Sequence, residues 1–330
     1  MKRLLLLALL VLAGCGGTET VREPGVVVSG SPSAAPVQGA PVPDGAVRIA
    51  VVTHGPASSK FWAIIRNGVD SAARRLDVLV DYQSPDVFSV ERMSELIDQA
   101  VATKPDGLVV SIPSPGLAPA IRRAVKAGIP VVSINSGSDV FRSLGVLVHV
   151  GQVEDRAGLE AGRRLAGAGV RRALCINPEE SNTGTDARCA GLAKAMREVG
   201  GSSRVLHIDD EDPRTASQIA KAVAAGGIDG VLATNSLGGL AAAKGVAGKP
   251  VKVGTFDLGP DVLKAVEAGQ IFFAVDQQPY LQGYLPIEML ALRARYGILP
   301  AQHDVVATGP NFVTRDDAAQ ALELSERSIR

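Results

Sequence analysis

The strongest constraint on the fold is a regular alternation between short apolar runs and longer amphipathic stretches. Residues 47–53 form an apolar run that ends in polar residues, and the apolar residues between Phe61 and Leu76 then recur at helical spacing. This pattern predicts a strand followed by a helix, and it repeats along most of the chain. Apolar strands that alternate with amphipathic helices are typical of parallel sheets covered on both faces. We therefore expect an α/β, doubly wound fold.

The repeat can be followed from residue 47 to residue 296. The predicted strands lie at 47–53, 79–82, 107–112, 130–135, 146–151, 172–177, 204–208, 230–235, 251–257 and 272–277. The predicted helices lie at 61–76, 90–103, 117–127, 155–168, 185–199, 214–225, 239–246, 260–268 and 280–296.

The composition argues against a nucleic-acid-binding protein and against a largely disordered one. The 330 residues include 34 Lys plus Arg and 34 Asp plus Glu, so the net charge gives no electrostatic case for binding nucleic acid. Hydrophobic residues make up 46% of the chain, which is too apolar for a largely disordered protein. Residues 47–330 are numerous enough for two α/β domains.

The first residues have the pattern of an export signal. Lys2 and Arg3 precede the apolar run 4–13, which is too short to span a bilayer as a helix. The run leads into the sequence LAGC at 12–15, which resembles a bacterial lipobox, with Cys15 as the lipidated residue. A plain secretory signal with an incidental cysteine is the alternative. We expect residues 1–14 to be a lipoprotein signal peptide.

Residues 15–46 are rich in Gly, Pro, Ser and Ala and show no sustained period. Such a segment buries too little apolar surface to offset the entropy lost on ordering, so it predicts a flexible tether. The protein is then expected to be exported and held by its lipid on the bacterial cell membrane, facing outside the cytoplasm.

Polar residues follow the predicted strands. Ligands of open parallel sheets bind beyond the carboxyl ends of the strands, so these residues are candidates for contact. Neutral amides and hydroxyls suit a neutral polyol, although each residue alternatively caps the next helix or forms a turn. The strand-end residues are Thr53, His54, Ser111, Asn135, Asn177, Asn235, Asp257 and Gln277.

Cys175 lies in a predicted strand and Cys189 in the helix that follows. We expect them to form a disulfide, in keeping with an exported protein, and the alternative is two buried thiols. No histidine lies near either cysteine in the sequence, so a metal site is not favoured.

Enzyme motifs are not found in the sequence. The four histidines are far apart, and there is no metalloprotease motif, nucleophile elbow, phosphate-binding loop or dinucleotide fingerprint. A glycoside hydrolase built on Asp257 needs a second carboxylate such as Asp276 or Asp139. We expect a binding protein with no catalytic residue, cofactor or metal.

Several short motifs occur in a characteristic order. They are Phe61-Trp62, KPDGLVV at 104–110, AGIPVV at 127–132, HVG at 149–151, VGTFD at 253–257 and DQQPYLQG at 276–283. With these motifs, residues 47–315 resemble the periplasmic sugar-binding proteins of the ribose- and galactose-binding type.

The resemblance implies two doubly wound lobes of the type I periplasmic binding protein fold. Three chain crossings form the hinge between the lobes, and hinge closure encloses the ligand. The implied N-terminal lobe comprises 47–149 and 279–305, and the implied C-terminal lobe comprises 150–278 and 306–330.

The resemblance also implies a set of ligand-binding residues. Phe61 and Trp62 provide aromatic faces for a sugar ring, with Trp62 preferred as the contact and packing under the helix as the alternative. Gln277 is preferred over Gln278. The other positions carried over are Ser111, Asn135, Arg188, Asn235 and Asp257.

Two of these positions carry particular implications. Asn135 and Ser136 stand where ribose-type proteins have Asp and Arg, which places ribose itself in doubt. Arg188 matches a ligand-binding arginine, and its alternative is a surface ion pair with Asp186 or Glu198.

The function implied is a substrate-binding lipoprotein of an ABC-type importer. It binds a neutral sugar or polyol, presents it to a membrane permease and is expected to be a monomer. The alternatives are a lipoprotein that senses a ligand and reports to a receptor and, less favoured, a secreted sugar-processing enzyme. Inositol, a hexose, a pentose, a sugar-like signal and a nucleoside all suit the polar strand ends.

Overall fold

The computed structural model describes residues 45–56 and 59–330. The expected signal peptide (1–14), the lipidated Cys15 and all but the last two residues of the expected tether (15–46) lie outside the described residues. In the part of the chain that the structure describes, no helix combines the length and apolar character needed to cross a membrane.

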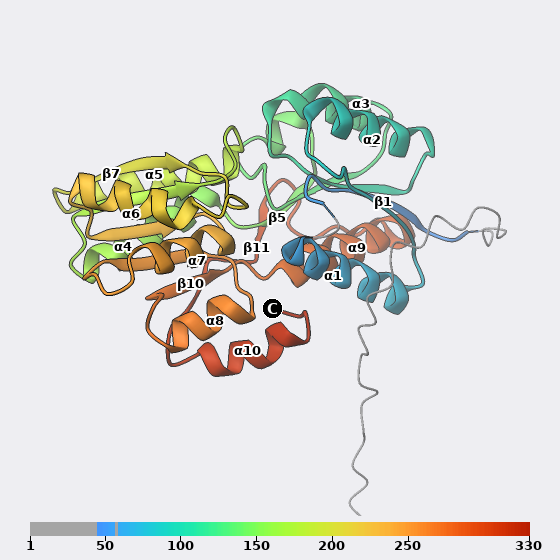
Figure 1. Cartoon of the computed structure of the whole chain (residues 1–330). Coiled ribbons are helices and arrows are strands. Elements are labelled where there is room, and N and C mark those ends of the chain that lie inside the picture. Colours follow the sequence, from blue (N-terminus) through green and yellow to red (C-terminus); the bar gives the residue numbers. More distant parts are fainter. Residues whose placement is uncertain (1–44, 57–58) are drawn as a thin grey trace, which may run out of the picture. The chain divides into compact units, whose positions relative to one another are not determined.

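The first lobe is built on a six-stranded sheet with the order β11–β5–β4–β3–β1–β2 (Figure 1). Its strands are β1 (Arg48–Val52), β2 (Leu79–Gln83), β3 (Gly107–Ser111), β4 (Val131–Ile134), β5 (Val148–Gly151) and β11 (Val305–Ala307). The helices packed on it are α1 (Lys60–Leu76), α2 (Val90–Ala102), α3 (Ala118–Lys126) and α9 (Pro279–Tyr296).

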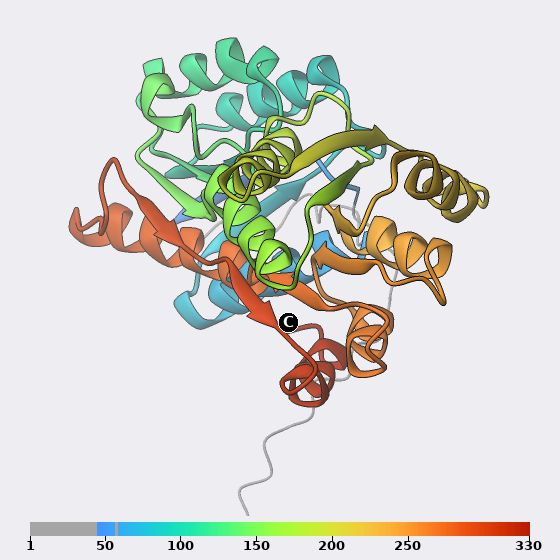
Figure 2. The same ribbon diagram turned by 90° about the vertical axis from the view of Figure 1, so that its left-hand side faces the viewer.

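The second lobe, which faces the viewer in Figure 2, repeats this plan with the order β12–β10–β9–β8–β6–β7. Its strands are β6 (Arg172–Asn177), β7 (Ser202–His207), β8 (Gly230–Ala233), β9 (Lys252–Phe256), β10 (Phe273–Asp276) and β12 (Asn311–Val313). Its helices are α4 (Glu154–Gly167), α5 (Thr183–Glu198), α6 (Thr215–Gly226), α7 (Ser236–Gly245), α8 (Pro260–Glu267) and α10 (Ala318–Glu326).

Burial on both faces explains why the central strands are apolar throughout. In β3, Leu108 and Val110 join the core under α2 and α3, whereas Val109 joins the core under α1 and α9. Successive side chains of a strand point to opposite faces, so both faces must be apolar. The α/β fold predicted from the sequence, with parallel sheets in two lobes, is confirmed.

The last part of the chain departs from the predicted repeat. β11, β12 and α10 were not predicted, and β12 pairs antiparallel with β10, whereas all the other strand pairs among the described residues are parallel. β11 and β12 have only three residues each, which is too short for a periodic pattern to be recognised.

The chain passes between the two sheets three times, from β5 to α4, from β10 to α9 and from β11 to β12. Hydrogen bonds join these crossings. The backbone N–H of Thr308 donates to the carbonyl of Gly151 at 2.9 Å, and the side-chain amide of Asn311 donates to the carbonyl of Asp276 at 3.4 Å. The crossings therefore form one bonded segment.

A glycine lets α4 and α5 pack closely against each other. A Cβ atom at Gly158 in α4 would lie 2.1 Å from the backbone oxygen of Arg188 in α5. Because no real Cβ approaches so closely, the contact requires glycine. This close contact fixes the position of Arg188 relative to α4.

Replacing Gly158 with alanine should force the two helices apart. We expect G158A to lower the free energy of unfolding by about 1–3 kcal/mol, as over-packing generally does. Urea unfolding followed by circular dichroism measures the loss. G167A on the same helix is the control, because its Cβ would meet nothing within 4 Å. Equal stability of the two variants would contradict the close-packing argument.

Candidate functional site

Hydrogen bonds connect polar strand ends of the two lobes. Asn135, which follows β4, donates from Nδ2 to Oε1 of Gln277 at 3.3 Å. Gln277, which follows β10, donates from Nε2 to Oδ1 of Asp257 at 2.5 Å. Asp257 follows β9. The structure thus brings three of the predicted site residues together at the carboxyl ends of both sheets.

The backbone is left-handed at these strand ends. The φ angle is +60° at Asn135, +67° at Asp257 and +52° at Gln278. Residues other than glycine rarely adopt this conformation, and Asn and Asp tolerate it best. Such conformations persist where the surrounding structure holds them, and they concentrate at ligand-binding sites.

Arg188 lies in a buried ion pair with Glu154, the first residue of α4. Its Nε donates to Glu154 Oε2 at 2.6 Å and its Nη2 to Oε1 at 3.1 Å. Nη1 donates to the carbonyl of Thr234 at 2.8 Å, and the guanidinium lies 4.3 Å from the centre of the Phe256 ring. Three of the five guanidinium N–H groups are used in these bonds, which leaves donors for a ligand.

Arg188 forms neither of the two surface ion pairs, with Asp186 or with Glu198, that the sequence offered as alternatives. Asp186 accepts instead from the Asn177 side chain at 2.8 Å, and Glu198 pairs with Arg163. Arg188 is only 5% exposed, so its contacts are those of a buried group. Its part in ligand binding stays a prediction.

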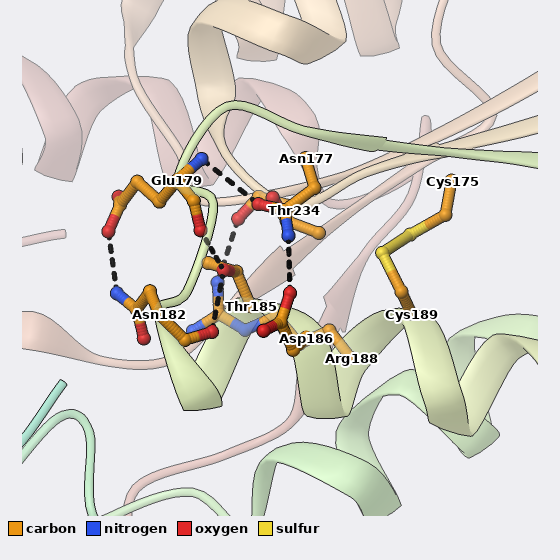
Figure 3. Close-up of a disulfide and its surroundings, with 9 residues drawn as sticks. All are labelled: Cys175, Asn177, Glu179, Asn182, Thr185, Asp186, Arg188, Cys189 and Thr234. Atoms are coloured by element: carbon orange, nitrogen blue, oxygen red, sulfur yellow. Dashed lines mark hydrogen bonds between the residues drawn. A yellow bond between two sulfur atoms is a disulfide. The ribbon is translucent and has the colours of Figure 1, made fainter. Parts of the chain in front are cut away.

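The loop before α5 is held by its own hydrogen bonds and by the disulfide (Figure 3). Asn182 caps α5 by accepting from the backbone N–H of Gly184 at 2.9 Å, and it donates to Glu179 at 2.5 Å. Cys175 in β6 and Cys189 in α5 form the expected disulfide. The bond ties α5 to the sheet directly beside Arg188.

In the first lobe, Ser111 fixes the ring of His54. Ser111 Oγ accepts from the backbone N–H of His54 at 3.0 Å and lies 2.9 Å from its Nδ1. Burial lowers the pKa of His54 to about 4, although the charge of Glu179 acts to raise it. The imidazole is therefore neutral at pH 7. The Ser111 side chain is therefore engaged by His54, and its contact with a ligand stays a prediction.

The aromatic pair in α1 divides between core and cavity. Trp62 is 7% exposed, belongs to the apolar core and meets the His54 ring edge-on at a centroid distance of 4.7 Å. Phe61 lines a cavity that Trp62 does not line. Stacking of Trp62 on a sugar stays a prediction.

Asn235 makes the bonds expected of a helix cap. Its Oδ1 accepts from the backbone N–H of Gly238 at 2.8 Å, and its Nδ2 donates to Asp210 at 2.6 Å. The neighbouring Ser236 lines the cavity. The structural role of Asn235 is thus visible, whereas its role in binding stays a prediction.

The cavity that Phe61 lines has a volume of about 440 Å³ and lies between the lobes. It is bordered by α1, by α7, by the turn between β9 and α8 and by the crossing from β10 to α9. Asp257 and Gln277 are among its lining residues. A volume of this size is in the range of small-molecule sites, roughly 300–1,000 Å³.

Three carboxylates influence the charge of the site. Burial raises the pKa of Asp257 to about 6, and Glu154 and Glu179 add to the rise. The charge of Arg188 and the hydrogen bond from Gln277 oppose it. Asp257 is therefore mostly ionised at pH 7 but takes up a proton in mild acid. Among the described residues, no group of three or more His, Cys, Asp or Glu side chains is arranged to hold a metal.

Sequence reasoning missed Glu154 and Glu179. Glu154 is 34 positions from its partner Arg188, and nothing local links the two. The one available signal was an acidic residue in the first turn of the helix after the first crossing, which also has an ordinary explanation in the helix dipole.

Comparison with known proteins establishes the family. The family profile described as "Periplasmic binding protein domain" matches residues 49–297. The chain belongs to this family.

Similar proteins include a carbohydrate transporter from Acidothermus cellulolyticus 11B, whose crystal structure contains myo-inositol. It is 34% identical, with a TM-score of 0.80 over 86% of this chain and 100% of that chain. The xylose/arabinose-binding protein of Sulfolobus acidocaldarius is 24% identical over 82% of this chain and 71% of its own length. An arabinose-binding protein from Geobacillus stearothermophilus shares the fold, with 23% identity and a TM-score of 0.68 over 83% of this chain and 99% of its own.

Removing the carboxylate of Glu154 should destabilise the second lobe severely. E154A leaves the buried Arg188 charge without its partner, so we expect the free energy of unfolding to fall by about 3–5 kcal/mol. Urea unfolding measures the difference. E198A is the control, because its pair with Arg163 has side chains 36% and 56% exposed, and exposed pairs contribute about 0.2–1 kcal/mol. Similar losses of unfolding free energy in both variants would show that the buried pair stabilises the protein no more than the exposed pair does.

Reducing the disulfide should also lower stability. Cys175 and Cys189 are 14 positions apart, and a loop of this length corresponds to about 3 kcal/mol. We expect dithiothreitol to lower the melting temperature of the protein and to leave that of the C175A/C189A variant unchanged. An unchanged melting temperature in the parent, with reduction verified by thiol titration, would contradict this expectation.

Proposed function

We propose that this protein is the substrate-binding component of an ABC-type importer and that it captures a neutral sugar or polyol between its two lobes. The observation that carries the proposal is the hydrogen-bonded series Asn135–Gln277–Asp257, in which groups of both sheets meet at one place. The sugar-binding proteins described above support the same ligand class. In particular, the Acidothermus structure contains a neutral cyclic polyol.

The chemistry of the site suits hydroxyl groups. Ionised Asp257 accepts hydrogen bonds from hydroxyls, and charge-assisted bonds of this kind are stronger than neutral ones. Arg188 retains N–H donors that its bonds to Glu154 and Thr234 do not use. Phe61 offers an apolar ring to the C–H face of a sugar. The positive charge of Arg188 is already matched by Glu154, so a neutral ligand is favoured.

The proposed mechanism is conformational and involves no bond chemistry. The proposed lobes are 47–149 with 279–305 and 150–278 with 306–330, and these bounds fall within β5 and β11, whose last residues stay in the first sheet. A ligand that contacts both lobes only when they are closed stabilises the closed state. The permease then distinguishes loaded from empty protein by its shape. Anchoring through a lipid on Cys15, a position outside the cytoplasm and a monomeric state complete the proposal.

Ligand titration with the Asp257 variant tests this function. The probes are myo-inositol, D-xylose, L-arabinose, D-glucose and D-galactose, followed through the fluorescence of Trp62, the only tryptophan in the chain. We expect one or more of them to bind and D257N to weaken that binding at least tenfold, which corresponds to about 1.4 kcal/mol. D316N at an exposed site is the control and should match the parent. If D257N bound the probe with the affinity of the parent, Asp257 would not be a ligand-binding residue.

The affinity should also depend on pH through Asp257. Burial raises the pKa of Asp257 to about 6, so its carboxyl is protonated below that pH and loses accepting capacity for ligand hydroxyls. We expect affinity to rise between pH 5 and pH 7 and then to level off, and the rise should vanish in D257N. His54 stays neutral throughout this range, because its pKa is about 4. Calorimetric titrations at several pH values measure the trend, and a flat profile in the parent would contradict it.

A further inference from the structure

The cavity beside Asp257 and Gln277 continues along a wall that is mainly apolar. Side chains of both lobes form this wall. They are Phe61 and Ile64 of α1, Leu237 and Leu240 of α7, and Leu258 and Val262 beyond β9. Leu237 is 50% exposed, and Ile64, Leu240 and Leu258 are partly exposed. Val262 is buried behind them, and the other five side chains form an open apolar surface next to the polar groups.

We propose that this apolar wall binds an apolar substituent on the ligand, so that the preferred ligand is a sugar or polyol carrying an alkyl or aryl group, such as a glycoside. The inference rests on the proposed function, because the polar part of the ligand occupies the site at Asp257 and Gln277. The inference goes further by naming the class of ligand that the apolar part of the cavity favours.

The distribution of polar and apolar groups supports two different ligand parts. An unsubstituted sugar needs hydrogen-bonding partners around most of its rim. Asp257 and Gln277 supply such partners, and Lys60, Ser236 and Asp261 also line the cavity, whereas Leu237, Leu240 and Leu258 offer none. A free sugar placed against the leucines would lose hydrogen bonds to water without replacement. An alkyl or aryl group gains from the same contact.

The C-terminal segment limits the length of such a substituent. Ser325, Glu326, Ser328 and Arg330 line the cavity. Arg330 Nε donates to the buried carboxylate of Asp276 at 2.6 Å, and the carbonyl of Ser328 accepts from Asn67 Nδ2 at 3.4 Å. The segment is thus bonded to the end of β10 and to α1. The cavity is bounded on this side, and Asp276 compensates the charge of Arg330.

Paired ligands test the inference in the full protein. Calorimetric titration compares D-xylose and D-glucose with their methyl and phenyl β-glycosides. We expect each phenyl glycoside to bind at least tenfold more tightly than its parent sugar, and the methyl glycoside to lie between them. L237S should remove most of this gain and leave the affinity for the parent sugar unchanged. V87S is the control, because Val87 is 81% exposed and lies outside the cavity lining.

The outcomes separate this inference from the proposed function. If the sugars bind and their phenyl glycosides bind no better, the apolar wall is not a subsite and the proposed function stands. The same conclusion follows if L237S retains the full gain. If neither the sugars nor the glycosides bind, the proposed function fails and the inference fails with it. A phenyl glycoside that binds where its parent sugar is too weak to detect supports both, provided that L237S abolishes the binding.

Discussion

The buried ion pair between Arg188 and Glu154 is the interaction on which the arrangement of α4 and α5 in the second lobe depends. Moving two charges out of water is costly, and the cost is met only when geometry and further hydrogen bonds are good. Here the close α4–α5 contact at Gly158 sets the distance between the helices, and the disulfide holds α5 to β6. The guanidinium of Arg188 is consequently held at a fixed place, near enough for its charge to act on the pKa of Asp257.

Residues with local signals were predictable from the sequence. Asn135, Asp257 and Gln277 each follow an apolar strand, and in a parallel sheet that position places a residue at the carboxyl edge of its own sheet. The disulfide was predictable for a similar reason, because a strand and the helix after it pack together. The order of the motifs added the family and the two-lobe fold.

Residues with non-local contacts were not predictable. Glu154 acquires its role only when α4 packs on α5, and adjacent aromatic residues do not reveal which of them enters the core. In the structure Trp62 packs on His54 in the core, whereas Phe61 reaches the cavity. Asn235 was ambiguous for another reason, because its side chain suits both a helix cap and a ligand contact. In the structure it makes the cap hydrogen bond. The three-residue strands β11 and β12 pair only because earlier strands provide an edge.

The bonded crossings have a mechanical consequence. A single connecting strand would let the lobes twist and slide as well as bend. Three adjacent connections joined by hydrogen bonds, such as that between Thr308 and Gly151, resist twisting because rotation about any one of them strains the other two. Bending about an axis across all three remains soft. In the proposed mechanism, we therefore expect the lobes to open and close mainly by this bending, so that the groups of both lobes return to the same relative positions after each cycle.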